Sequence, residues 1–196
     1  MTFKSAVVHP LSRAMSRVTQ VVRTTSDDRI GAATLARLRA EAAHPQTVWS
    51  PPTINGVLPR GVHEVSIGAF LVQYGGTPRR DGLLRPFAAR VDALARKGVK
   101  EVYVGGSMTT DNPIPRDIDV LIGARSVRTL GMRGRLHDMA HGLNWHVAER
   151  RHTTFDPSWR GARPSWLEFF QFDRQMHPRG VVRIVLETPE TALRGS

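Results

Sequence analysis

The hydrophobic positions of residues 81–98, "DGLLRPFAARVDALARKG", repeat with the period of a helix. The apolar side chains that fall on one helical face are Leu84, Phe87, Val91 and Leu94. Gly98 stands where this helix would end, because glycine readily adopts the left-handed conformation that follows a helix C-terminus. The pattern therefore predicts one amphipathic helix in this segment.

Short apolar runs bounded by turn-forming residues predict four strands, at residues 100–106, 117–123, 143–150 and 180–187. Helical spacing recurs between Ser126 and His141, and an aromatic-rich stretch after Pro164 predicts a further short helix. The resulting order is helix, strand, strand, helix, strand, helix, strand. This order predicts an α+β fold, an α/β sandwich built around a small mixed sheet.

The first 55 residues are rich in Ser, Thr and Arg and show little apolar periodicity before about residue 30. One helix is predicted there, with Asp27 or Asp28 as its cap and Pro45 just beyond its end. Its apolar stripe consists of Ile30, Leu35, Leu38 and Ala42. Because so thin a stripe buries little by itself, we expect the helix to dock onto another part of the protein.

A stretch rich in proline and glycine separates this segment from the rest of the chain. Residues 50–61, "SPPTINGVLPRG", contain three prolines and two glycines, a composition that suits neither a helix nor a central strand. We therefore expect a boundary near residue 55. It would separate a basic N-terminal extension with one helix, residues 1–55, from the main domain, residues 56–196.

Composition excludes several classes of protein. With 196 residues, of which 40% are hydrophobic and 23% charged, the chain suits one folded globular domain rather than a disordered or fibrous protein. The absence of cysteine excludes disulfides, thiolate metal sites and a cysteine nucleophile. No apolar run approaches the roughly 20 residues that span a bilayer, and the N-terminus is too weakly apolar for a secretory signal. We expect a cytoplasmic protein without a membrane partner.

The chain is strongly basic, with 28 Lys and Arg against 17 Asp and Glu and a net charge of +11. Most of the excess is arginine, whose planar guanidinium suits phosphate recognition, so a polyanion such as RNA or DNA is a plausible partner. Arg79, Arg80, Arg150 and Arg151 could line an entry for such a partner. A basic, solvated surface that reflects an arginine-rich composition is the alternative, and charge alone does not decide between the two.

The stretch "VYVGGSMTTDNPIPRDIDVLIG", residues 102–123, carries two aspartates in an apolar run. Alternate side chains of a strand share a face, so Asp117 and Asp119 would lie on one face with Cα atoms roughly 6.6 Å apart, opposite the apolar face. At that separation both carboxylates can converge on a divalent cation. Without a cation their like charges would repel and raise a pKa.

Gly105, Gly106 and Ser107 directly follow the preceding predicted strand. Missing side chains allow backbone N–H groups to approach an anion, and the serine hydroxyl can add a hydrogen bond, which together make a phosphate cradle. Mg²⁺ held by carboxylates beside such a cradle is typical of phosphoryl or nucleotidyl transfer. A lone Gly-Gly is usually a turn and a lone Asp-x-Asp usually a solvated strand edge, so the hypothesis depends on their combination.

"GGS" followed by "DID" inside apolar strands resembles the signature of the polymerase-beta-like nucleotidyltransferase superfamily. More narrowly, "LPRGVHEVSIGAFLVQYG", "VYVGGSMTTDNPIPRDIDVLI" and "WLEFFQFDRQMHPRGVVRIVL" are similar to a small uncharacterised bacterial and phage group of nucleotidyltransferase-like proteins. This likeness covers about residues 57–187. It implies a mixed sheet with helices packed on one face.

The resemblance also implies roles for particular residues. Gly106 and Ser107, with Gly105 beside them, would contact a nucleoside triphosphate, and Asp117 and Asp119 would bind Mg²⁺. The superfamily commonly carries a third carboxylate on a neighbouring strand, where it acts as general base.

The predicted strand "NWHVAER" lacks the apolar-flanked aspartate of the superfamily. It offers Glu149 as the catalytic candidate and His146 on the opposite face; alternatively, Glu149 pairs with an arginine at the surface. Arg116, just before the aspartates, would either clamp a phosphate or neutralise Asp117. Trp159, Trp166, Phe169 and Phe170 would either stack on bases or pack in the core.

The leading hypothesis is therefore Mg²⁺-dependent transfer of a nucleoside monophosphate from a nucleoside triphosphate to a hydroxyl. The acceptor would be tRNA, another RNA or a protein, and small members of the superfamily often act as toxins beside an antitoxin or another protein partner. Two alternatives stay open. One is a catalytically silent module that binds nucleic acid or a partner, and the other is a structural component of a larger assembly such as a phage particle.

Overall fold

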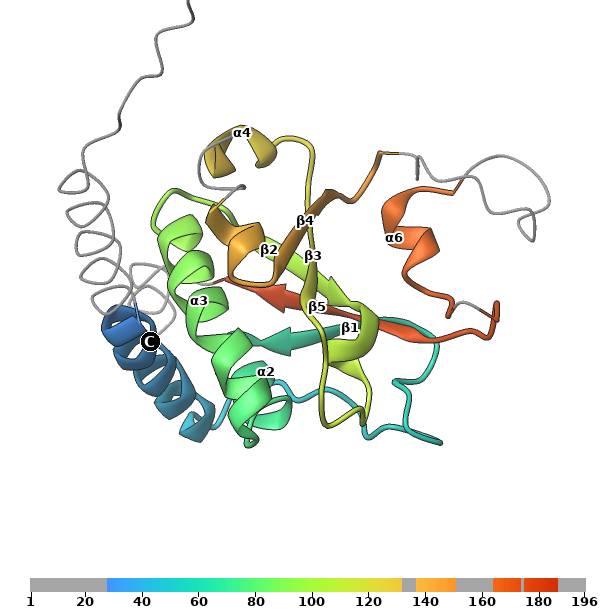
Figure 1. The fold of residues 1–196 in the computed structure, drawn as a ribbon, viewed down its shortest axis with the longest axis horizontal. Coiled ribbons are helices and arrows are strands. Elements are labelled where there is room, and N and C mark those ends of the chain that lie inside the picture. Colours follow the sequence, from blue (N-terminus) through green and yellow to red (C-terminus); the bar gives the residue numbers. More distant parts are fainter. Residues whose placement is uncertain (1–27, 132–136, 151–163, 174, 187–196) are drawn as a thin grey trace, which may run out of the picture.

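The computed structural model describes residues 28–131, 137–150, 164–173 and 175–186. It shows an α+β fold around a mixed five-stranded sheet (Figure 1). The strands follow the order β1, β5, β2, β3, β4 across the sheet. Their bounds are β1 Gly61–Ser66, β2 Glu101–Gly105, β3 Ile118–Ile122, β4 Leu143–Val147 and β5 Gly180–Val185. The predicted fold class and the four predicted strands are confirmed, and β1 is an additional edge strand.

Strand directions fix which ends of the strands meet. β2 runs antiparallel to both of its neighbours, β3 and β5. β3 and β4 are parallel, as are β1 and β5, so a crossover must connect β3 to β4. That crossover contains α4 (Val127–Leu130) and helical residues 137–140. Both lie within the predicted 126–141 helix, of which residues 132–136 lie outside the described part.

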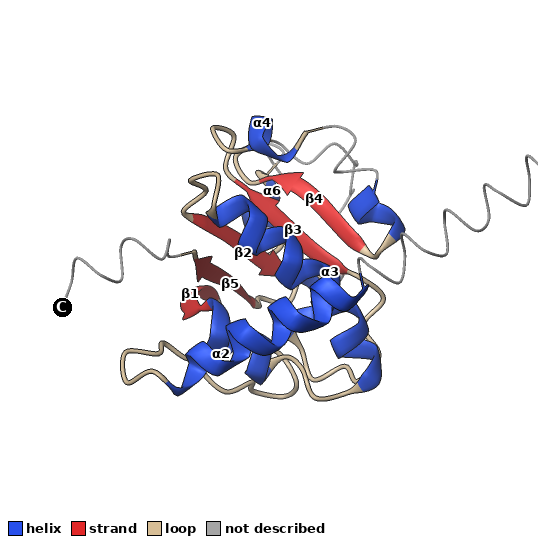
Figure 2. Ribbon diagram, turned by 90° about the vertical axis from the view of Figure 1, so that its left-hand side faces the viewer, coloured by secondary structure: helices blue, strands red, loops and turns tan. Residues whose placement is uncertain are grey.

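The longest helices cover one face of the sheet (Figure 2). They are α2 (Ile67–Gln73), α3 (Pro78–Ala95) and the helix of residues 28–40, which continues into a 3₁₀ turn, η1 (Glu41–Ala43). The main core lies beneath them and receives apolar side chains from all five strands. α3 confirms the predicted amphipathic helix. Within the described residues, no helix combines the length and the apolar character needed to cross a membrane.

A smaller apolar cluster lies on the other face, where α6 (Trp166–Phe169) packs. Its buried members are Leu121, Ala148, Phe170 and Val181. β3 therefore contributes to both faces. Ile118, Val120 and Ile122 belong to the main core, as predicted, while Leu121 faces α6. Because side chains alternate along a strand, Asp119 shares the α6 face with Leu121.

The helix of residues 28–40 packs into the main core, as predicted for a helix with so thin a stripe. Leu35 and Leu38 are buried in that core, whereas Ile30 is exposed. A Cβ added to Gly68 would lie 2.7 Å from the carbonyl oxygen of Leu38, so the glycine allows α2 to approach this helix closely. The predicted cap Asp27 lies outside the described residues, and Asp28 is already helical.

Candidate functional site

Asp117 directly precedes β3 and Asp119 is its second residue, on the face of the sheet where α6 packs. Asp119 is paired with Gly105 of β2 and with Asn144 of β4. Asn144 in turn donates a 2.7 Å hydrogen bond to Oδ2 of Asp117. The structure therefore brings Asp117 and Asp119 together, and Asn144 of β4 lies next to both of them.

Electrostatics distinguish Asp117 from an ordinary surface aspartate. Burial raises the pKa of Asp117, and the neighbouring charge of Asp119 raises it further. The Asn144 hydrogen bond and the guanidinium groups of Arg116 and Arg79 oppose this rise without cancelling it. Two carboxylates held this close in a half-buried position favour either a proton or a cation between them.

Gly106 forms the other half of the site. Its φ is +73°, a conformation that side-chain-bearing residues rarely adopt. A Cβ at this position would lie 2.3 Å from Oδ2 of Asp119, so that carboxylate packs against the bare Cα. The glycine bend and the acidic pair are thus in direct contact. Ser107, the next residue, is partly exposed in the 3₁₀ turn η2 (Gly106–Thr109).

Gly105 occupies a different environment from Gly106. It has an extended conformation at the end of β2, and a Cβ there would lie 3.2 Å from the ring of Phe170. Phe170 is buried, and Trp166 stacks on it with ring centroids 5.7 Å apart. Of the two roles considered for these aromatics, core packing holds for Phe170. Trp159 lies outside the described residues.

His146 of β4 is a neighbour of the acidic pair that the sequence analysis did not assign to the site. Its Nε2 lies 3.5 Å from Oδ1 of Asp119, and its ring contacts that of Trp166 in a tilted arrangement with centroids 4.0 Å apart. Nε2 is buried and has no hydrogen-bond partner among the residues that the structure describes. The sequence signal for Asn144 and His146 was the pair of polar residues on alternate positions of an otherwise apolar strand.

Glu149, the predicted third carboxylate, lies elsewhere. It follows β4 and accepts a 2.9 Å hydrogen bond from the backbone N–H of Ala124, just beyond the far end of β3. Asp119 is near the opposite end of the same strand. The structure therefore does not bring Glu149 to the acidic pair, and its hydrogen bond ties the loop after β3 to the end of β4.

The arginines around the site divide into two kinds. Arg116 is exposed beside Asp117, where its charge lowers the pKa of that carboxyl, so both roles considered for it remain open. Arg79 donates hydrogen bonds to the backbone carbonyls of Pro115 and Arg116. Arg80 is only 6% exposed and therefore does not line an entry for nucleic acid.

Arg80 instead holds the loop that joins the glycine bend to the acidic pair. Its guanidinium donates hydrogen bonds of 2.5–3.1 Å to four backbone carbonyls, those of Tyr74, Met108, Thr110 and Asn112. Burial lowers the pKa of Arg80, and the nearby charge of Asp111 opposes that shift. One buried side chain thus sets the path of the loop between Ser107 and Asp117.

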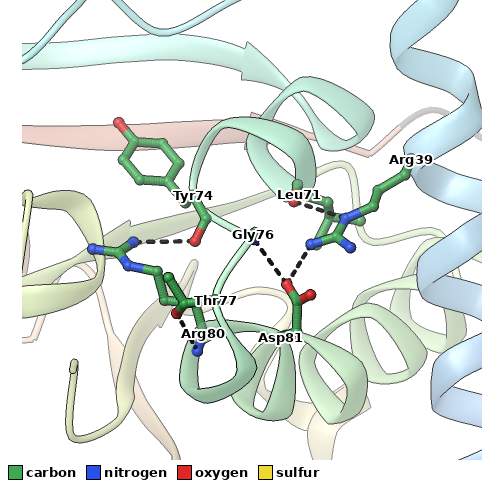
Figure 3. Close-up of polar contacts among 7 residues, drawn as sticks. All are labelled: Arg39, Leu71, Tyr74, Gly76, Thr77, Arg80 and Asp81. Atoms are coloured by element: carbon green, nitrogen blue, oxygen red, sulfur yellow. Dashed lines mark hydrogen bonds and ion pairs between the residues drawn. The ribbon is translucent and has the colours of Figure 1, made fainter. Parts of the chain in front are cut away.

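The beginning of α3, which carries Arg80, is itself held from two sides (Figure 3). Thr77 caps the helix by accepting a hydrogen bond from the backbone N–H of Arg80. Asp81 accepts hydrogen bonds from Arg39 at 2.6 Å and from the backbone N–H of Gly76 at 3.1 Å. Burial alone would raise the pKa of Asp81, but these hydrogen bonds lower it. The docked N-terminal helix therefore supports the element that shapes the site.

A protein-family model described as a family of unknown function (DUF6932) matches residues 51–185, well over half of the chain. The chain belongs to DUF6932. A search of curated proteins and a search of solved structures found no match. The DUF6932 match contains all five strands and every residue of the acidic pair and glycine bend. It begins after the helix of residues 28–40, although that helix packs into the same core.

The donor set of this DUF6932 protein limits the kind of metal site it can form. Among the described residues, no group of three or more His, Asp or Glu side chains is arranged to hold a metal ion. Mg²⁺, however, is commonly bound through one or two carboxylates, with substrate phosphates and water completing the shell. The Asp117–Asp119 pair fits that pattern, because Gly106 leaves the Asp119 carboxylate beside backbone that carries no side chain.

Proposed function

We propose that this protein is a metal-dependent nucleotidyltransferase that transfers a nucleoside monophosphate from a nucleoside triphosphate to a hydroxyl and releases pyrophosphate. The observation that carries the proposal is the contact between the Asp119 carboxylate and the Cα of Gly106. It joins an acidic pair suited to a cation and a glycine bend suited to a phosphate in one site.

Each residue of the site has a part in this proposal. Asp117 and Asp119 would hold Mg²⁺, which when bound neutralises phosphate charge. The backbone at Gly106 and the partly exposed Ser107 would bind phosphate oxygens, and Arg116 would bind a further phosphate from beside Asp117. Positioning and charge neutralisation supply most of the catalysis in phosphoryl transfer, and these groups would provide both.

The electrostatics of the pair support a functional rather than a stabilising role. Because the folded-state pKa of Asp117 is raised, its ionised form is less favourable in the folded protein than in the unfolded chain. Such a carboxylate lowers stability above its folded pKa, and the penalty disappears as the pH falls through that pKa. A group that costs stability at neutral pH without a ligand is typical of binding and catalytic sites.

The Asp117→Asn variant is therefore expected to be more stable than the wild type at neutral pH in the absence of metal, by up to about 1 kcal/mol. Its amide oxygen can still accept the hydrogen bond from Asn144. The difference is expected to shrink as the pH is lowered through the raised pKa of Asp117. Urea unfolding at a series of pH values measures it; a variant that is less stable at every pH contradicts the electrostatic argument.

A second candidate function is favoured by Asn144. This residue faces Asp119 on the neighbouring strand, where the resemblance implies a third carboxylate, and an amide cannot accept the proton of an attacking hydroxyl. The alternative is a nucleotidyltransferase-like module that binds nucleotide, nucleic acid or a protein partner without transfer. The net charge of +11 suits an RNA in either case, as acceptor or as ligand.

Label transfer separates the two candidates. The purified protein is incubated with each α-labelled nucleoside triphosphate, divalent metal and total tRNA, and label in tRNA and in protein is counted. Metal-dependent transfer that is lost in Asp117→Asn and Asp119→Asn, but retained in Glu64→Gln, is expected for the enzyme. Glu64 is a suitable control because it is an exposed carboxylate on β1 of the same sheet. Nucleotide or RNA binding without transfer identifies the silent module.

A further inference from the structure

The imidazole of His146 carries a buried nitrogen, Nε2, that forms no hydrogen bond with the described residues. Buried polar side-chain atoms in proteins, in contrast, are nearly always satisfied. A cation bound by the protein can supply the interaction that this nitrogen lacks. The polar atom that lies opposite Nε2 is Oδ1 of Asp119, at 3.5 Å.

The geometry between these two atoms suits a shared cation better than a hydrogen bond. A hydrogen bond to an imidazole nitrogen is close to 2.9 Å long, well short of the 3.5 Å observed. Bonds from a transition-metal ion to imidazole nitrogen and carboxylate oxygen are about 2.0–2.2 Å long. Two donors 3.5 Å apart can therefore both bind one such ion without a large movement.

Both donors are held in place by their surroundings. The His146 ring packs against Trp166, with ring centroids 4.0 Å apart, and against Phe170, with ring centroids 5.4 Å apart. The Asp119 carboxylate rests with Oδ2 against Gly106, which leaves Oδ1 directed toward His146. Ligand side chains that are already held in position lose little conformational entropy when they bind a metal ion.

We propose that Asp119 and His146 together bind a first-row divalent transition-metal ion, so that the site selects such an ion over Mg²⁺. Imidazole is a ligand for transition metals, whereas Mg²⁺ prefers oxygen. Asp119 also belongs to the acidic pair, and water or phosphate oxygens complete the shell. This inference rests on the proposed function, because it names the metal of the same site.

Metal binding itself tests the proposal, with Mn²⁺ and Mg²⁺ as the probes. Bound Mn²⁺ is counted by electron paramagnetic resonance, and Mg²⁺ binding is measured by calorimetry, on the full chain. The wild type is expected to bind Mn²⁺ at least about tenfold more tightly than Mg²⁺. His146→Phe, which keeps an aromatic ring against Trp166, and His146→Gln are each expected to weaken Mn²⁺ binding about tenfold or more, with little change for Mg²⁺.

His177→Gln is the matched control, because His177 is 76% exposed and its hydrogen bonds within the described residues are to nearby Asp173. Circular dichroism verifies that the variants fold. Should a His146 variant be unfolded, Asp119→Asn serves in its place and is expected to lose both metals. Equal affinities of the wild type for Mn²⁺ and Mg²⁺, or unchanged Mn²⁺ binding in the folded variants, would overturn the proposal.

The outcomes for the metal and for the reaction are separable. Mn²⁺ binding through His146 without label transfer retains the metal site and rejects the nucleotidyltransferase. Label transfer that uses Mg²⁺ and Mn²⁺ equally, and that is unaffected in His146→Phe, retains the enzyme and rejects the role of His146.

Discussion

Replacing Gly106 with alanine is expected to lower the free energy of unfolding by about 2–4 kcal/mol and to abolish metal and nucleotide binding. The φ of +73° costs a side-chain-bearing residue about 1–2 kcal/mol. The new methyl would lie 2.3 Å from Oδ2 of Asp119, and overpacking of this kind adds about 1–3 kcal/mol. Because the methyl can be accommodated only if Asp119 moves, function is lost together with stability. Urea unfolding and Mn²⁺ titration measure the two effects.

Gly98→Ala is the matched control for this variant. Gly98 also has a positive φ, +82°, but a Cβ there would meet nothing within 4 Å. Its replacement is therefore expected to cost only the backbone term, about 1–2 kcal/mol, and to leave binding intact. If Gly106→Ala is no worse than Gly98→Ala and still binds metal, the carboxylate is not packed against this glycine, and the proposed site is rejected.

The acidic pair was predictable from sequence because the residues that determine its position all lie in one short segment. A strand has a period of two, so the run from Ile118 to Ile122 alone places Asp119 on the face opposite the core. The glycine bend was equally visible, since it directly follows an apolar run. What the sequence could not reveal was the contact between Gly106 and Asp119, which depends on the antiparallel pairing of β2 with β3.

β1 and α2 were not predicted, for a physical reason. The first five residues of α2 are all buried, so its sequence shows no alternation between apolar and polar faces. β1 ends at Ser66 and α2 begins at Ile67, with no loop residues between them to mark the change. Helix and strand are hard to distinguish in a short apolar run that lacks such signals.

The partner of the acidic pair on β4 depends on strand register, which sequence alone does not specify. Ile118 is paired with Leu143, and this register sets Asn144 opposite Asp119. A search of the sequence for a third carboxylate leads to Glu149, five residues beyond Asn144 and at the other end of the sheet. The neighbours of the acidic pair on β4 are instead an amide and an imidazole. An amide in place of a third carboxylate is the reason why a silent binding module is considered beside the enzyme.

Replacing Arg80 with methionine is expected to destabilise the protein by about 3–5 kcal/mol, the largest stability loss among these variants. Methionine keeps much of the buried aliphatic volume but removes all the donors of the guanidinium. Four carbonyls then lose a hydrogen bond, and a buried polar group without a partner costs about 1–3 kcal/mol. The loop between Ser107 and Asp117 is expected to become sensitive to proteases, and metal binding should weaken. Urea unfolding and limited proteolysis measure these changes.

Two further variants separate the roles of charge, shape and location. Arg80→Lys keeps the charge but lacks the planar fork, so it can reach only some of the carbonyls and should recover part of the lost stability. Arg79→Met removes a neighbouring guanidinium that also donates to two carbonyls, those of Pro115 and Arg116, but at a more exposed position. It is expected to cost less than about 1 kcal/mol.

Similar losses in Arg79→Met and Arg80→Met would show that the loop is not held by the buried guanidinium. Its path would then depend on backbone contacts such as the hydrogen bond from Asp111 to Gly56, and metal binding should survive the Arg80 change.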